Sequence, residues 1–110
     1  MDDCLFCKMI SGEIPCEKVF ESDKVLGFKD IYPQARTHLL FIHKEHTSNV
    51  NQMTGDQLAS VFEAIKAHTE EGLVEAGFRV VTNFGSNAGQ TVFHTHFHVL
   101  GGEKLSGFGS

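Results

Sequence analysis

The sequence predicts an α+β domain built on an antiparallel sheet, and three observations lead to this fold class. Short runs rich in apolar and aromatic residues follow one another at hairpin spacing, one long stretch has helical periodicity, and a run near the C-terminus alternates histidine with other residues. Strands joined by short turns pair antiparallel, whereas parallel strands need a long crossover. With 110 residues, of which 41% are hydrophobic, the chain is expected to form a single domain spanning residues 1–110.

The first half of the chain predicts a short helix followed by three strands. The helix is expected over residues 4–10, before a glycine and a proline interrupt the pattern. The runs 18–20 and 25–28 surround a polar turn, which is typical of a β-hairpin. A third strand is expected over residues 37–43, and alternation along it places His38 on the same face as two apolar residues.

The second half predicts one long helix and two further strands. Thr54 and Gln57 have the spacing of a capping box, and apolar residues recur at helical intervals over residues 58–76. A fourth strand is expected over residues 78–83 and, after a glycine-containing loop, a fifth over residues 91–100.

Three histidines on alternate residues, His94, His96 and His98, concentrate more chemistry than any other part of the chain. In a strand, every second side chain points to the same face, so all three imidazoles are expected on one surface, with Thr95 and Phe97 on the other. Imidazole serves in proton, metal or nucleophile chemistry near neutral pH. Since Cα atoms two residues apart in a strand are about 6.6 Å from each other, one metal could reach two of these rings but hardly three.

Charge and composition exclude several classes of protein. Fourteen acidic against nine basic residues give a net charge of −5, which argues against binding a nucleic-acid backbone. The N-terminus does not resemble a secretion signal, and the longest apolar run, residues 39–42, is far too short to cross a bilayer. We therefore expect a cytoplasmic protein without membrane association. His68, among charged helical residues, is expected to be a solvated surface residue.

The run from His94 to Leu100 resembles the motif of the histidine triad family, in which three histidines alternate with apolar residues. Residues 28–38 resemble the family's first nucleotide-contacting segment, and residues 83–91 include residues that resemble its phosphate-side loop. The resemblance covers nearly the whole chain and is closest to the nucleotide-binding, purine nucleoside phosphoramidase-like branch. Two departures stand out: Thr95 is polar where an apolar residue is usual, and the tail lacks the tryptophan-proline ending of some relatives.

The resemblance implies the histidine triad fold, a five-stranded antiparallel sheet with one long helix and a short N-terminal helix, and a homodimer. It also implies a hydrolase or transferase that cleaves the α-phosphate bond of purine nucleoside phosphoramidates or related nucleotide conjugates. The family places the nucleophile at the middle histidine, His96, which would form a nucleotidyl-histidine intermediate. His98 would contact the phosphate, His38 would orient a neighbouring ring, and His94 would flank the nucleophile.

The same resemblance assigns a set of side chains to the nucleotide. These residues are Phe28, Asp30, Ile31, Asn83, Gly89, Gln90, Thr91, His96 and His98. The carboxylate of Asp30 would accept hydrogen bonds from ribose hydroxyls, and Phe28 and Ile31 would line the base. Gln90 and Thr91 would donate hydrogen bonds to the phosphoryl oxygens.

Cys4 and Cys7 have the spacing of a metal-binding or redox pair, and an idle pair of thiols has the same pattern. The resemblance adds His46 and His94 as two further ligands. Two thiolates and two imidazoles without an open position make a structural zinc site, so no catalytic cofactor is expected.

Three other functions are compatible with the same residues. The chain could be a nucleotide-sensing or partner-binding module with vestigial hydrolysis, or a hydrolase of dinucleoside polyphosphates. It could also be a metallohydrolase that uses two triad histidines at a catalytic zinc.

Overall fold

Five strands form one antiparallel sheet in the computed structural model, which describes residues 3–74 and 76–107. The strands are β1 (Lys18–Glu21), β2 (Val25–Lys29), β3 (Thr37–His43), β4 (Phe78–Val81) and β5 (His96–Gly101). Their order across the sheet is β1-β2-β3-β5-β4, so β3 and β5 are central neighbours, and each adjacent pair is antiparallel. The predicted fold class is confirmed.

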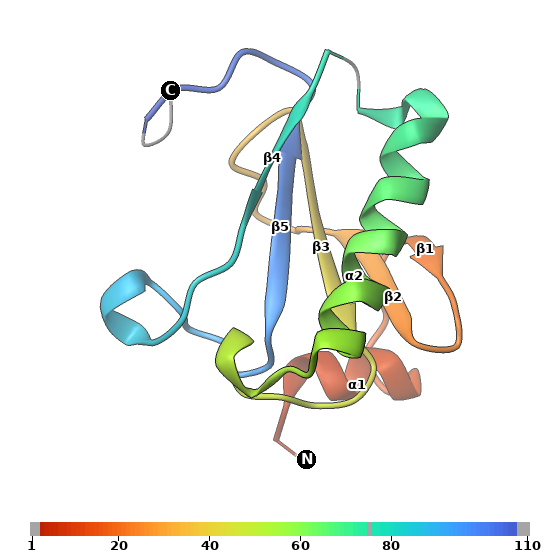
Figure 1. Ribbon diagram of the computed structural model, residues 1–110, viewed down its shortest axis with the longest axis vertical. Coiled ribbons are helices and arrows are strands. Elements are labelled where there is room, and N and C mark those ends of the chain that lie inside the picture. Colours follow the sequence, from red (N-terminus) through yellow and green to blue (C-terminus); the bar gives the residue numbers. More distant parts are fainter. Residues whose placement is uncertain (1–2, 75, 108–110) are drawn as a thin grey trace.

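The helix α2 (Gly55–His68) lies along one face of the sheet (Figure 1). Its capping box forms as predicted: the Thr54 hydroxyl accepts a hydrogen bond from the Gln57 N–H at 3.1 Å, and the Gln57 side chain accepts one from the Thr54 N–H at 2.9 Å. The helix contributes its apolar stripe to a buried cluster with residues of β2, β3 and β5. This cluster contains Val25, Leu39, Phe41, Met53, Val61, Ala64, Ile65, Phe97 and Val99.

The long helix ends eight residues earlier than predicted, at His68 instead of Ala76. The Thr69 hydroxyl donates to the Ile65 carbonyl at 2.8 Å, and Gly72 adopts a left-handed conformation with φ 77°. At these residues the α-helix changes to an irregular turn. The helical spacing of apolar residues in the sequence therefore continues beyond the last residue of the α-helix.

The prediction that His68 is a solvated surface residue is wrong, because only 6% of it is exposed. His68 lies seven residues after Val61, and seven residues are almost two full helical turns, so both side chains face the sheet. Its ring centroid is 5.9 Å from that of Phe41. The helical spacing was the signal in the sequence, and the charged neighbours concealed it.

The helix α1 (Leu5–Ser11) packs on the opposite face of the sheet from α2. Its Phe6 belongs to a second buried cluster, together with Leu26, Phe28, Leu40 and Ile42. Directly paired residues of antiparallel strands point to the same face. Since His98 pairs with Leu40 and His96 pairs with Ile42, both histidines project on the α1 face.

The last strand begins at His96, not at residue 91 as predicted. The Thr95 N–H donates to the Thr47 carbonyl at 2.8 Å rather than to a neighbouring strand, so residues 91–95 form a loop. His94 is therefore not on the strand, and the predicted triad face holds only for His96 and His98. Thr95, expected opposite the histidines on the strand, is 3% exposed within this loop.

Short helical turns complete the described chain. They are η1 (Val50–Gln52), η2 (Thr69–Leu73) and η3 (Ser86–Ala88). Strand β4 ends at Val81, two residues before the predicted end. Among residues 3–74 and 76–107, no helix has the length and apolar character needed to cross a membrane.

Candidate active site and metal site

Strands β3 and β5 bring three predicted site histidines together on the α1 face. The Nε2 atom of His38 lies 2.8 Å from the Nδ1 atom of His98, and the ring centroids of His96 and His98 are 5.1 Å apart. The Asp30 carboxylate, in the loop after β2, lies 3.4 Å from the His38 Nε2 atom. The pairing of two central strands thus joins residues that are 60 positions apart in the sequence.

One backbone donor fixes the tautomers of the His38–His98 pair. The Gln34 N–H donates to His38 Nδ1 at 3.0 Å, so this nitrogen carries a lone pair. In neutral His38 the proton is then on Nε2, which donates to His98 Nδ1. His98 in turn keeps its proton on Nε2. One backbone N–H therefore sets the tautomer of two rings.

His96 has the complementary tautomer. Its Nδ1 lies 2.8 Å from the carbonyl oxygen of His94 and, because a carbonyl only accepts, Nδ1 carries the proton. The Nε2 atom then carries the lone pair. This arrangement gives His96 the nitrogen that a nucleophile requires.

Burial keeps these rings neutral near pH 7. Desolvation by burial, together with repulsion from like charges on His96 and His38, lowers the pKa of His98 to about 4. Burial also lowers the pKa of His96 and of His38, while the Asp30 carboxylate acts in the opposite direction. The lone pair of His96 Nε2 is consequently available at physiological pH.

Asp30, His38 and His98 also offer ligand atoms within 4.8 Å of one another. A metal on His38 Nε2 would displace its proton, and the proton could not move to Nδ1, because the Gln34 N–H points at that atom. Metal-binding histidines normally donate their other ring N–H to an acceptor. The hydrogen bonds therefore favour proton sharing over metal binding at these three residues.

The loop before the triad is held by the Gln90 side chain, which is 2% exposed. Its amide donates to the carbonyls of Ser48 at 2.6 Å and Val92 at 3.2 Å, and its oxygen accepts from the Gly85 N–H at 2.9 Å. Gly89 ends the turn η3 with φ 97°, a conformation that favours glycine. Gln90 thus fixes the loop in which the neighbouring residues lie.

Two other residues predicted for the phosphate side flank this loop. Asn83 follows strand β4 and is half-buried, whereas Thr91 is exposed. Thr91 lines a hollow of about 650 Å³ together with Cys4 and His46. Thr91 therefore lies next to the cysteine-containing segment.

The residues predicted for the base and ribose lie at different depths. Phe28 is 2% exposed and packs edge-on against Phe6, with ring centroids 5.5 Å apart, whereas Ile31 is 79% exposed. The Asp30 carboxylate accepts a hydrogen bond from the Tyr32 N–H at 2.8 Å, which fixes its orientation. Asp30 and His38 also line a cavity of about 390 Å³. Phe28 is part of the core, and Ile31 is free to contact a ligand.

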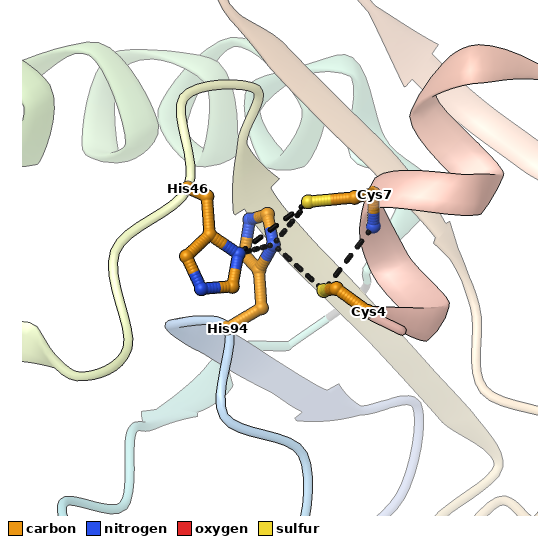
Figure 2. A group of neighbouring side chains, drawn as sticks. All are labelled: Cys4, Cys7, His46 and His94. Carbon is orange, nitrogen blue, oxygen red and sulfur yellow. Dashed lines mark hydrogen bonds between the residues drawn. The ribbon is translucent and has the colours of Figure 1, made fainter. Parts of the chain in front are cut away.

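Four predicted metal ligands converge beside the triad (Figure 2). The cluster joins Cys4 and Cys7 of the N-terminal segment, His46 of the loop after β3, and His94 of the loop before β5, with all ligand atoms within 4.8 Å of one another. The His94 Nδ1 atom is 3.4 Å from Cys4 Sγ, 3.5 Å from Cys7 Sγ and 3.2 Å from His46 Nδ1.

The chemistry of this cluster fits a zinc ion. The Nε2 of His94 lies 2.9 Å from the carbonyl oxygen of His43, to which it donates, and the lone pair on Nδ1 is therefore directed at the cluster. Burial lowers the pKa of His94 to about 4, so the ring is neutral. Thiolate sulfur and neutral imidazole are the ligands of tetrahedral zinc sites, and the two thiols would lose their protons when the ion binds.

A family model described as the HIT domain matches residues 11–105, which include the His38–His98 pair and the triad. The chain belongs to the histidine triad (HIT) family. A relative in Helicobacter pylori, described as an uncharacterized HIT-like protein, is 43% identical over 101 residues, which cover 91% of this chain and 97% of the relative.

Solved structures agree with this membership. A HIT family hydrolase from Clostridium thermocellum is 40% identical, with a TM-score of 0.89 and coverage of 97% of this chain and 96% of that one. A histidine triad nucleotide-binding protein from Candida albicans is 36% identical, with a TM-score of 0.80 and coverage of 88% and 73%. These neighbours support a hydrolase-type enzyme with the HIT fold.

Two contacts in this HIT protein could not be read from its sequence. The Gln34 N–H acts through the backbone, so its side chain gives no signal for the hydrogen bond to His38. The hydroxyl groups of Thr47 and Thr95 lie 2.7 Å apart, although the residues are 48 positions apart. The only signal for Thr95 was its polarity at a position where the family motif has an apolar residue.

Proposed function

We propose that this HIT protein cleaves the α-phosphate bond of purine nucleoside phosphoramidates or related nucleotide conjugates through a nucleotidyl intermediate on His96. The observation that carries this proposal is the tautomer of His96, whose Nδ1–H is held by the His94 carbonyl at 2.8 Å, leaving the Nε2 lone pair for attack. Covalent capture divides one difficult displacement into two easier steps.

In the first step, the lone pair of His96 Nε2 forms a bond to the α-phosphorus. The phosphorus–nitrogen bond of the substrate breaks, and the departing amine takes up a proton from solvent water. In the second step, water attacks the same phosphorus and gives up one proton to solvent, the bond to His96 breaks with its electron pair returning to Nε2, and a nucleoside monophosphate is released. The Nε2–H of His98 would donate to a phosphoryl oxygen and stabilise its developing charge.

The neighbouring residues would hold the nucleotide around this centre. Asp30 would accept hydrogen bonds from ribose hydroxyls, and exposed Ile31 would contact the base. Thr91 and Asn83 would contact the phosphate from the loop whose shape is fixed by the buried amide of Gln90. The same proposal includes a homodimer as the assembled state.

Zinc is the metal proposed for the cluster of Cys4, Cys7, His46 and His94. When bound, it would supply a closed, four-ligand structural anchor between the N-terminal segment and the two loops. The His94 ring is then held on one side by the cluster and on the other by its hydrogen bond to the His43 carbonyl at 2.9 Å. The carbonyl oxygen of His94 accepts the hydrogen bond that orients His96. The metal cluster would therefore help to position the proposed nucleophile without contacting the substrate.

The proposal is tested with the substitution His96→Asn and an adenosine phosphoramidate substrate. The asparagine amide can take the position of Nδ1 and still donate to the His94 carbonyl, but it lacks Nε2. We expect turnover to fall by at least about 1000-fold while binding of adenosine monophosphate is kept, since removal of a nucleophile abolishes its covalent route. Mass spectrometry of quenched wild-type reactions should detect the nucleotidyl adduct on His96.

His43→Asn is the matched control, because it removes another buried histidine, which pairs with Val25 on the opposite face of the sheet and does not line the cavity of Asp30 and His38. It is expected to retain turnover. Wild-type turnover in His96→Asn would refute the nucleophile assignment. Micromolar nucleotide binding without turnover of any phosphoramidate in the wild type would favour a sensing module, and turnover of dinucleoside polyphosphates alone would favour that hydrolase class.

A further inference from the structure

Thr95 is a buried polar residue between the nucleophile and a predicted metal ligand, and the catalytic proposal does not use it. It is 3% exposed. A buried hydroxyl is costly unless it is hydrogen-bonded, so an apolar side chain of the same shape would be the simpler choice at such a position. The presence of a hydroxyl calls for a physical reason.

The Thr95 hydroxyl is hydrogen-bonded to Thr47 in the loop that follows β3. It donates to the Thr47 carbonyl at 3.1 Å, and the two hydroxyl oxygens are 2.7 Å apart. Each hydroxyl has one proton, so the Thr47 hydroxyl donates to that of Thr95. The Thr95 N–H also donates to the Thr47 carbonyl, at 2.8 Å. We refer to these three hydrogen bonds as the threonine pair.

The threonine pair joins the residues that directly follow the two imidazoles of the metal cluster. Thr47 follows His46, and Thr95 follows His94. The Nδ1 atoms of these histidines are 3.2 Å apart. Two nitrogens bound to one tetrahedral zinc at 2.0–2.1 Å would be about 3.3 Å apart. The two histidine nitrogens therefore already lie close to the spacing that zinc requires.

The two imidazoles are supported unequally without the threonine pair. His94 is also fixed by its hydrogen bond to the His43 carbonyl, at 2.9 Å. His46 lies in the loop after β3. Among the described residues, the next hydrogen bond from this loop to the triad side is the one from Gln90 to the Ser48 carbonyl, two residues away. The threonine pair is therefore the nearest connection that holds His46 in register with His94.

We propose that Thr95 is a positioning residue for the metal site. Through its hydroxyl contacts with Thr47, Thr95 holds His46 and His94 at the spacing that a tetrahedral ion requires. Because the ligands are already placed, less conformational freedom is lost when the ion binds. Residues that orient metal ligands in this way typically change metal affinity by about 10–100-fold when they are substituted. The proposal rests on the metal site described above.

The test compares Thr95→Val with Thr95→Ser in the full chain. Valine keeps the volume and the backbone N–H but removes the hydroxyl, whereas serine keeps the hydroxyl. Zinc affinity is measured by competition with a chromophoric chelator, using protein without a histidine tag under reducing conditions. We expect Thr95→Val to weaken zinc binding by about 10–100-fold. Thr95→Ser should remain within about threefold of the wild type, and the visible spectrum of bound Co²⁺ should be altered only in the valine variant.

Thr47→Val removes the partner hydroxyl at a less buried position, so it remains informative if Thr95→Val does not fold. If the two hydroxyls act as a pair, the loss in the double variant is less than the sum of the two single losses. Thr69→Val is the control, because its hydroxyl donates to the Ile65 carbonyl at 2.8 Å, away from the cluster. This variant should bind zinc as tightly as the wild type.

Several results would overturn the proposal. Unchanged zinc affinity in both Thr95→Val and Thr47→Val would show that the hydroxyls do not position the ligands, as would an equal loss in Thr95→Ser. A lower melting temperature of the metal-free protein with unchanged affinity would assign Thr95 a purely structural role. If the wild type itself binds no stoichiometric zinc, the metal site is refuted together with this role.

Discussion

Replacing His98 with asparagine should make the stability of the protein less sensitive to acid. Burial lowers the pKa of His98 from 6.5 to about 4, whereas an unfolded chain restores the ordinary value. Between these two values the unfolded state binds more protons than the folded state, so acidification favours unfolding. The contribution of neutral His98 to the free energy of unfolding is fully present above about pH 6.5 and is lost as the pH falls toward 4.

The magnitude follows from this pKa difference. Between pH 7 and pH 5, proton uptake by His98 in the unfolded state alone lowers the free energy of unfolding by about 2 kcal/mol. Asparagine does not titrate, and its side-chain oxygen can replace His98 Nδ1 as the acceptor for His38. The asparagine variant should therefore lose about 2 kcal/mol less than the wild type over the same pH interval.

The assay is urea unfolding of both proteins at several pH values, with the free energy of unfolding extrapolated to water. His43→Asn is again the control, since it substitutes a buried histidine on the other face of the sheet. If lowering the pH from 7 to 5 decreases the free energy of unfolding equally in the wild type and in His98→Asn, His98 does not remain neutral in the folded protein. The reasoning from burial would then be refuted.

Three further substitutions test the structure around the site by urea unfolding. Phe6→Ala removes a ring that is 4% exposed and whose centroid lies 5.2 Å from that of His96. It should lower the free energy of unfolding by about 3–5 kcal/mol, and wild-type stability would contradict this. Gly27→Ala places a Cβ atom 2.8 Å from the buried Phe41 ring and should lower the free energy of unfolding by about 1–3 kcal/mol. Gly55→Ala is its control, because a Cβ atom there lies more than 4 Å from every other part of the fold outside its own helix and chain neighbours, and this variant should not be destabilised. Gln90→Ala leaves the carbonyls of Ser48 and Val92 without their donor and should lower the free energy of unfolding by about 1–3 kcal/mol. It should also raise KM for the nucleotide, and an unchanged KM would show that the loop does not depend on this amide.

Local patterns determined the general form of this protein. Alternation predicted which residues of β3 share a face, because successive side chains in a strand point to opposite sides wherever the strand lies. Thr54 and Gln57 predicted the beginning of α2, because a capping box needs only two residues three positions apart. The spacing of the histidines and of Cys4 and Cys7 likewise indicated the chemistry to be expected before any contact was known.

Contacts between distant segments decided the rest. The sequence could not show that the Thr95 N–H would bond to Thr47 instead of to a strand, and this contact moves His94 off β5 and toward the cysteines. Nor could it show that the Gln34 N–H sets the proton of His38. Local propensity is encoded in neighbouring residues, whereas the choice of partner for each backbone and side-chain polar group depends on which distant segments the fold brings within hydrogen-bonding distance.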